Sequence, residues 1–313
     1  MRICSLIPGA TEVIAALGLE DQLVGISHEC DFPPSIRRVP VMIEPLVEAE
    51  HTTSSGIDQR VKELVAAGQQ LYQLKEDAFR HARPDLILTQ DLCHVCSVTP
   101  DQLARTMQSL PHQPEMLILS PTTLQDMIHD IDRIARAVGA VSKGENLAAD
   151  LRDRLERVRL RTEKVAVRPR VVCLEWLDPL YVAGHWVPEM IDLAGGCNAL
   201  GSKDSPSYQT TWDDVAAARP DVVIVMPCGY SVDRTLNELR QDGPLQAAWQ
   251  RARTFWSDMY LVDAGSYFSR PGPRLIDGVE LLSAILHPDL DHPLDPAQAI
   301  KFDPSVLAGD SAP

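Results

Sequence analysis

Short apolar runs alternate with segments of helical periodicity along most of this chain. Near the amino end, an apolar run at residues 2–7 precedes a segment at residues 9–19 whose apolar residues recur at helical spacing, with Thr11 as its predicted N-cap. Another apolar run follows at residues 22–27. This order of strand, helix and strand predicts an α/β fold with a mainly parallel sheet, because parallel neighbours need a crossover connection.

The same alternation continues to about residue 288 and predicts most of the remaining elements. In the first half we expect a helix at 56–68, a short strand and helix within 71–82, a strand at 84–90, a helix at 99–110 and a strand at 115–120. In the second half we expect strands at 168–177, 221–227 and 259–265 and helices at 184–196, 210–220, 231–241 and 273–288.

Helical periodicity runs with little interruption from about residue 123 to residue 165, with a narrow apolar stripe and i,i+4 charge pairs. These features are typical of a long, partly exposed helix, and we interpret the segment as a rigid connector. The predicted organisation is an amino-terminal α/β lobe (1–122), a connecting helical segment (123–167), a carboxy-terminal α/β lobe (168–288) and a Pro- and Asp-rich tail (289–313) that covers a surface or frays.

Two stretches indicate that the lobes are duplicated. "HARPDLILTQDLC" at 81–93 and "AARPDVVIVMPCG" at 217–229 share the end of a helix, Arg-Pro-Asp, an apolar strand and then a cysteine. The shared order predicts two copies of one Rossmann-like architecture.

The amino-acid composition of the chain argues against some classes of binding partner. The chain has 313 residues, 45% of them hydrophobic, and a formal net charge of −15. That charge argues against nucleic acid or an anionic membrane as partner, since both bind clustered Lys and Arg. The first residues show no secretory pattern and no window approaches a membrane span, so the chain as given is expected to be cytoplasmic, or periplasmic if the true start lies upstream.

Several motifs together resemble the helical-backbone, or class III, family of substrate-binding proteins, over roughly residues 1–288. They are the opening "SLIPGATEVIAALGLEDQLVGIS" with the following "DFPP", the paired "ARPDLIL" and "ARPDVVIV" strands, the long central helix, and "GHWVPEMIDLAGG" followed by "TTWDDVAAARPD". Within that family the chain is most similar to the cobalamin-binding proteins of vitamin B12 import.

The resemblance implies two α/β lobes joined by one long helix, a ligand cleft between the lobes, and an ABC permease as partner if the chain is exported. Siderophore and haem binders share the same motifs, so the resemblance specifies the fold more closely than the ligand. The chain departs from the family in showing no export signal and in carrying "SHEC", "DLCHVC" and "PCGY". Coupling to a transporter therefore stays open.

Ligands of α/β sheets bind outside the carboxyl ends of the strands, where this sequence gathers aromatic and polar residues. The predicted ligand contacts are Trp176, His185, Trp186, Tyr267, Phe268 and Arg270, with Pro8, Gly9 and Ala10 of the first turn lining the cleft. The two tryptophans are either core residues or a stacking surface for a flat ligand, and Arg270 is suited to a phosphate or carboxylate. His185 is a cobalt ligand, a polar contact or a helix cap. These residues predict a binding protein for cobalamin, a related corrinoid or another large planar ligand.

Cysteines support a second hypothesis. Cys93 and Cys96 follow a strand as Cys-x-x-Cys, and Cys30 and Cys228 are also predicted at strand ends. Four thiolates, or three with His28 or His94, would ligate zinc, and four would ligate an iron–sulfur cluster. The alternatives for the Cys-x-x-Cys pair are buried thiols and a redox pair. A metalloprotein or enzyme on this scaffold is therefore the alternative function, although no nucleotide-binding loop and no Ser-His-Asp spacing appears.

The other three cysteines are predicted to have structural roles. Cys4 and Cys173 lie inside apolar strand runs and are predicted in the core, whereas Cys197 follows "AGG" and is predicted in a turn. An odd total of seven and a reducing compartment both disfavour structural disulfides; in an oxidising one, a Cys93–Cys96 bond would need considering.

Overall fold

A computed structural model describes residues 1–47, 52–91, 103–104, 107, 113–241, 243–290 and 294–304. The chain forms two compact units. Unit 1 comprises Met1–Thr52, Gly56–Arg152 and Pro271–Pro273, and unit 2 comprises Thr53–Ser55, Asp153–Arg270 and Arg274–Pro313. Each unit contains its own sheet, so the protein has the two-lobed α/β fold that the sequence predicts.

Unit 1 is built around a four-stranded parallel sheet in the order β2-β1-β5-β6. Its elements are β1 (Ile3–Ser5), α1 (Pro8–Ala16), β2 (Leu23–Ile26), β3 (Ile43–Pro45), α2 (Ser54–Ala66), β4 (Tyr72–Leu74), α3 (Glu76–Ala82), β5 (Leu86–Gln90), β6 (Glu115–Leu119) and α5 (Leu124–Ala137). The first two residues of α2, Ser54 and Ser55, belong to unit 2. The strands β3 and β4 form a separate antiparallel pair. All the predicted strands of this lobe are confirmed, and the predicted helix at 99–110 lies mostly outside the described residues.

The start of α1 differs from the prediction. Ile7 occupies the N-cap position and Pro8 the first turn, so Thr11 is not a cap but lies inside the helix. Its hydroxyl is buried and donates to the Ser5 hydroxyl at 2.8 Å. Proline supplies the helix start here because its fixed φ suits the first turn and its missing N–H would have no partner there.

The helical segment after β6 consists of two helices rather than one. The first, α5, begins with a capping box in which the Thr123 hydroxyl accepts from the Asp126 N–H at 3.1 Å. It ends before Gly139, whose φ of +70° is readily adopted only by glycine. The second, α6 (Val141–Thr162), contains the boundary between the two units.

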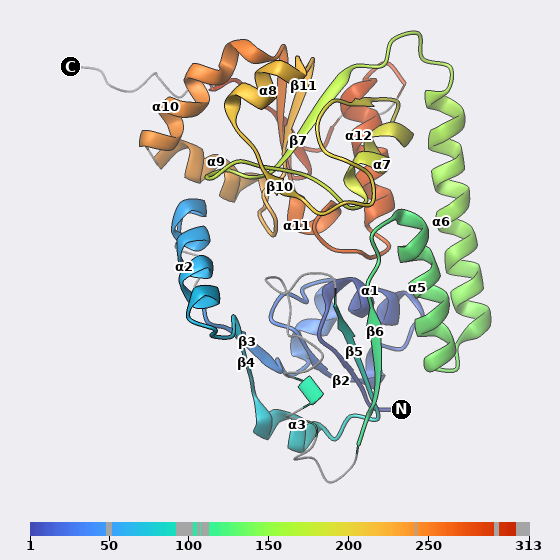
Figure 1. Cartoon of the computed structure of the whole chain (residues 1–313). Helices are drawn as coiled ribbons and strands as arrows, with labels where there is room; N and C mark the ends of the chain where they lie inside the picture. The colour runs from blue at the N-terminus through green and yellow to red at the C-terminus, as the bar shows by residue number, and fades with distance from the viewer. Residues whose placement is uncertain are drawn as a thin grey trace. The chain divides into compact units, whose positions relative to one another are not determined.

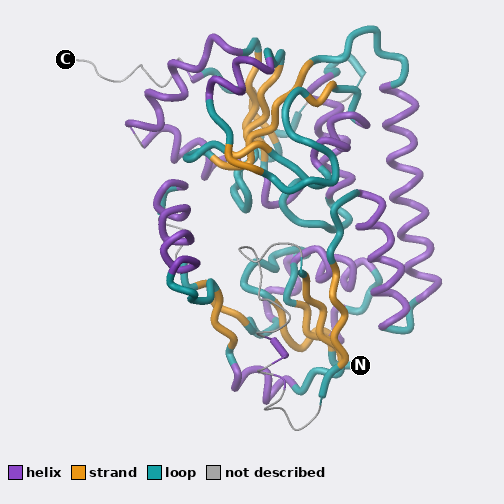
Figure 2. The backbone as a smooth tube through the Cα atoms, viewed as in Figure 1, coloured by secondary structure: helices purple, strands orange, loops and turns teal. Residues whose placement is uncertain are grey.

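Unit 2 has a larger, mixed sheet with the order β10-β8-β7-β11-β12-β13, and β9 also pairs with β7. Its elements are β7 (Arg170–Trp176), β8 (Tyr181–Val182), α7 (Val187–Leu193), β9 (Cys197–Asn198), β10 (Tyr208–Gln209), α8 (Trp212–Ala218), β11 (Val222–Val225), α9 (Val232–Gln241), α10 (Gly243–Ala252), β12 (Asp258–Val262), α11 (Ala264–Tyr267), α12 (Leu275–Leu286) and β13 (Ala299–Lys301). Figure 2 shows helices on both sides of its strands.

Three short strands of unit 2 correct the sequence interpretation. Cys197 lies in β9 and pairs in parallel with β7, so it is a strand residue rather than a turn residue. The region after Asp289 contains β13, which extends the sheet by pairing antiparallel with β12. Beyond Trp176 the chain turns back as β8, which runs antiparallel to β7. Strands of two or three residues are too short to show periodicity in a sequence.

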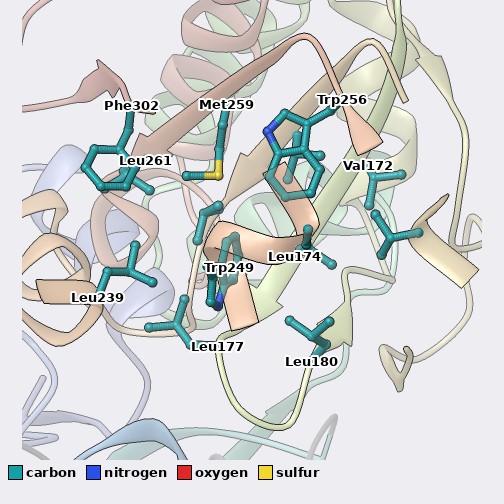
Figure 3. Close-up of a cluster of buried hydrophobic side chains, with 14 of the residues drawn as sticks. Val172, Leu174, Leu177, Leu180, Leu239, Trp249, Trp256, Met259, Leu261 and Phe302 are labelled. Carbon is teal, nitrogen blue, oxygen red and sulfur yellow. The ribbon is translucent and has the colours of Figure 1, made fainter. Parts of the chain in front are cut away.

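The core of unit 2 lies between its parallel strands and the helices α9 and α10 (Figure 3). Alternate residues of β7 and of β12 face this core, Val172 with Leu174 and Met259 with Leu261, as the two-residue period of a strand requires. Trp249 of α10 is fully buried against them. Cys4 and Cys173 are buried as predicted, and burial raises the pKa of both thiols, so they remain protonated core side chains.

The duplicated sequence motif corresponds to a duplicated set of bonds. In unit 1, Arg83 ends α3 in the left-handed region at a φ of 42°. The Asp85 carboxylate accepts the backbone N–H of Arg2 at 2.7 Å, and the Arg2 guanidinium donates through Nε to the Ala82 carbonyl at 2.7 Å. The arginine thereby ties the start of β1 to the end of α3.

Unit 2 repeats this arrangement residue for residue. Arg219 ends α8 at a φ of 45°, the Asp221 carboxylate accepts the Arg170 N–H at 2.7 Å, and the Arg170 guanidinium donates to the Ala218 carbonyl, at 2.7 Å through one terminal nitrogen. Because the same hydrogen bonds recur in both units, we interpret these Arg and Asp residues as part of the shared strand–helix architecture.

Candidate functional site

The carboxyl ends of three adjacent parallel strands form one edge of the unit 2 sheet. The strands are β7, β11 and β12. The segments at this edge are 175–176, the last two residues of β7, together with 226–230 and 263–270, which follow β11 and β12. We call these three segments the unit 2 rim. Ligand sites of parallel α/β sheets occur at such edges.

Hydrogen bonds join the segments of the rim to one another. The Cys228 N–H donates to the Glu175 carbonyl at 3.0 Å, the Gly229 N–H to the Ser269 hydroxyl at 3.2 Å, and the Gly265 N–H to the Tyr230 carbonyl at 3.1 Å. Because each segment is bonded to a neighbour, the rim has a fixed geometry before any ligand arrives.

An aromatic pair lies in this rim. The ring of Trp176 meets the ring of Tyr230 edge to face, with centroids 5.5 Å apart, and the Trp176 indole N–H donates to the carbonyl of Ser54, a residue of unit 2, at 3.1 Å. The Arg234 guanidinium lies 3.6 Å from the centroid of the Tyr230 ring. Trp176 is thus held from two sides while remaining half-buried.

Tyr230 packs against Trp176 but is itself buried, so it offers almost no surface to a ligand. It is 1% exposed, and its hydroxyl donates to the Glu238 carboxylate at 3.0 Å. Burial, together with the neighbouring Glu238 charge, raises the pKa of this phenol, so it stays protonated and keeps donating. The sequence analysis considered this segment through Cys228 but did not name Tyr230, an aromatic residue in the loop that follows β11.

Trp186 and Phe268, which the sequence predicts as ligand contacts, belong to the interior of unit 2. They are 5% and 3% exposed, and the Trp186 indole N–H donates to the Phe268 carbonyl at 2.8 Å. This bond joins the start of α7 to Phe268, the residue that follows α11 in the rim. Tyr267 is half-buried, with its hydroxyl accepting from the Gln298 side chain at 3.1 Å, and Arg270 is half-buried at the end of the same segment.

His185 does not follow the carboxyl end of a parallel strand, because the chain has already turned back through β8. It is also not a helix cap: Trp186 occupies the N-cap position of α7, without a side-chain cap bond. Its backbone has a φ of +52° and is held by its N–H donating to the Ser205 carbonyl at 2.6 Å. Burial lowers the pKa of its imidazole, against the opposing effect of Asp204, so the neutral ring is favoured. Its role as a ligand contact stays a prediction.

The predicted first-turn residues are packed within unit 1. Gly9 and Ala10 are buried and Pro8 is half-buried. A Cβ on Gly9 would lie 2.1 Å from the carbonyl oxygen of Pro271, which also belongs to unit 1, so the glycine allows two backbones to approach. The backbone at this turn is therefore already in contact with protein.

The four predicted metal ligands are placed only in part. Cys30 is buried in unit 1 with its sulfur 3.1 Å from the Thr11 hydroxyl, and Cys228 is exposed in the unit 2 rim. Cys93 and Cys96 lie outside the described residues. Across the part of the chain that the structure describes, no group of three or more His, Cys, Asp or Glu side chains is arranged to hold a metal ion. The zinc or iron–sulfur hypothesis stays a prediction.

Comparison with known proteins defines the class to which this fold and rim belong. The sequence matches the family described as periplasmic binding protein over residues 3–249. The chain therefore belongs to the periplasmic binding protein family. Within the described helices, none combines the length and apolar character needed to cross a bilayer.

Particular relatives are similar along nearly the whole chain. A vitamin B12-binding protein of Vibrio cholerae is 25% identical over 296 residues, which is 91% of this chain and 88% of that protein. Among solved structures, a periplasmic heme-binding protein from Pseudomonas aeruginosa superposes with a TM-score of 0.69 at 20% identity, covering 96% of this chain and 97% of that one. The periplasmic vitamin B12-binding protein of Vibrio cholerae gives a TM-score of 0.64 at 23% identity, covering 93% and 98%. The solved structures establish the shared fold.

Proposed function

We propose that this protein is a substrate-binding protein for a corrinoid, with cobalamin as the favoured example, or for a heme-like ligand, and that Trp176 of the unit 2 rim contacts the ring system. The observation that carries the proposal is the half-buried Trp176, fixed against Tyr230 at the edge where parallel α/β sheets bind ligands. The vitamin B12-binding relative, which aligns with 91% of the chain, supports this ligand class.

The chemistry of the rim suits a large planar ligand. The hydrogen bond to Ser54 and the edge-to-face contact with Tyr230 hold the Trp176 ring in one orientation. A ring that is already ordered loses little conformational freedom on binding, so more of the stacking energy contributes to affinity. Arg270 would provide a fork of donors for a phosphate or carboxylate on the edge of the ligand.

The partner and location follow from the same class. A substrate-binding protein presents its ligand to an ABC permease, and we propose that relationship here, outside the cytoplasm, as the names of the solved relatives state for those proteins. The expectation of a cytoplasmic location finds no support in the relatives and is not part of this proposal.

The test is a titration with hydroxocobalamin and, separately, with hemin, followed by the visible absorption of the ligand and by calorimetry. We expect saturable binding of one of them. Trp176→Ala should weaken that binding by roughly tenfold to 150-fold, since burying a large apolar side chain is worth about 1.5–3 kcal/mol. The control is Tyr208→Ala, which removes an aromatic that is 45% exposed in β10. A wild-type protein that binds neither ligand, or a Trp176→Ala variant that binds as tightly as wild type, would refute the proposal.

A further inference from the structure

A cavity of about 500 Å³ that is open to solvent lies in unit 1, and the described residues that line it, all of them exposed, are Arg2, Arg80, His81 and Arg83. Arg2 directly precedes β1, and the other three precede β5, so the cavity is at the amino ends of these parallel strands. Figure 1 shows α3 and the N-terminus at the same end of this unit. Ligand sites of parallel sheets are expected at the opposite, carboxyl ends.

The duplication separates the arginines that the fold needs from the basic residues that it does not. Arg2 and Arg83 have direct counterparts in Arg170 and Arg219, with the same hydrogen bonds or the same left-handed backbone. Their presence in unit 1 is explained by architecture.

Arg80 and His81 have no such counterpart, because alanines, Ala216 and Ala217, stand at the equivalent positions of α8. The fold is therefore built without basic side chains at these positions in unit 2. Unit 1 has the side chains of Arg80 and His81 at these positions, in addition to the guanidiniums of Arg2 and Arg83. The net charge of the whole chain is −15. No carboxylate is among the described residues that line the cavity.

The donors in the cavity are accessible to an anion. Within the described part of the chain, the Arg83 side chain makes no hydrogen bond or ion pair, and Arg2 uses only its Nε, toward the Ala82 carbonyl. Arg80 pairs with Glu76 at 3.0 Å and Asp77 at 2.8 Å, but these carboxylates are 55% and 86% exposed. Exposed ion pairs are worth little, so a multivalent anion can compete for the guanidinium.

We propose that this cavity is a binding site for a phosphate group, either free phosphate or a phosphate monoester. Guanidinium forks match the geometry of tetrahedral oxyanions and bind them through paired hydrogen bonds. The Arg2 and Arg83 guanidiniums supply such forks from the repeated architecture. Arg80 gives the unit 1 cavity an additional charge that unit 2 lacks, and His81 adds an imidazole whose Nδ1 lies 2.6 Å from the Asp77 carbonyl oxygen.

The experiment is calorimetric titration of the full chain with inorganic phosphate and, separately, with glycerol phosphate, at constant ionic strength and without tetrapyrrole. We expect saturable one-site binding of at least one of them, and the two arms distinguish a free-ion site from an ester site. The double substitution Arg80→Ala with His81→Ala introduces the alanines that unit 2 carries, and alanine favours a helix, so folding should be preserved. Binding should weaken at least tenfold in this variant and in Arg83→Gln.

The matched control is Arg219→Gln, which changes the equivalent residue of unit 2 and should leave phosphate binding unchanged. The site is overturned if wild type gives no saturable binding of either anion, if the double variant binds as wild type does, or if Arg219→Gln weakens binding as much as Arg83→Gln. Because no tetrapyrrole is present, this result is independent of the proposed function.

Discussion

Substitution of Trp186 tests whether this buried aromatic stabilises unit 2 or contacts the ligand, as the sequence predicts. Its side chain is 5% exposed, and its indole N–H donates to the Phe268 carbonyl at 2.8 Å. Trp186→Ala therefore removes a full core ring and a buried donor, and should lower the free energy of unfolding by about 3–5 kcal/mol, as such truncations typically do. Trp186→Phe keeps most of the ring and should cost about 1–3 kcal/mol, mainly through the lost donor.

The assay is urea unfolding of wild type, both Trp186 variants and Trp176→Ala, each followed by far-ultraviolet circular dichroism and titrated with the same ligands. Trp176 is half-buried, so its truncation should reduce stability by less than that of Trp186 while weakening binding more than Trp186→Phe does. The opposite pattern would refute this reasoning: if Trp186→Ala loses less than about 1 kcal/mol but no longer binds, its ring faces the ligand.

Two further predictions concern packing and buried charge. Gly278→Ala should destabilise unit 2, because the new Cβ would lie 2.3 Å from the Tyr267 carbonyl oxygen; overpacking of about 1–3 kcal/mol should outweigh a gain in helix propensity of about 1 kcal/mol. Gly243→Ala, where nothing lies within 4 Å of the new Cβ, is the control in urea unfolding, and equal effects would contradict the packing argument. Burial raises the pKa of Asp130 despite its contact with Arg133, so its carboxyl contributes most stability below its ordinary pKa and loses that contribution as pH rises through the raised value. The stability of Asp130→Asn relative to wild type should therefore be greatest at neutral pH and fall as the pH is lowered toward about 4; a pH-independent difference would contradict it.

The elements that the sequence predicts correctly are those whose signals are local and strong. The capped helix α8 begins where Thr211 and Asp214 form a capping box, and the buried parallel strands appear as apolar runs. The break between α5 and α6 depends on one residue, Gly139, whose positive φ is not evident within a periodic segment. The turn into β8 was missed because two-residue strands leave no pattern.

The site was harder to predict because position after a strand does not determine exposure. Trp176 and Trp186 lie in the same loop sequence, yet one is half-buried at a strand end and the other is in the interior. The intervening β8 reverses the chain, so the residues after it no longer extend the carboxyl edge. Tyr230 contributes through its support of Trp176, a contact between distant segments that no local pattern records.

The duplication shows where the two units diverge. Arg2, directly before β1, is equivalent to Arg170, the first residue of β7. The registers of these two strands with β5 and β11 correspond residue by residue, so Pro8 is the counterpart of Trp176. Unit 1 enters a helix at that point, because Pro8 starts α1, whereas unit 2 places a tryptophan there and then adds a hairpin. At the amino ends of the strands, unit 1 is the copy with the additional residues, because only it carries Arg80 and His81. Residues shared by both copies maintain the sheet and its helices, so residues present in one copy alone are where separate functions are expected. Trp176 and the basic cavity are both of this second kind, at opposite strand ends of different units, and the two titrations test them independently.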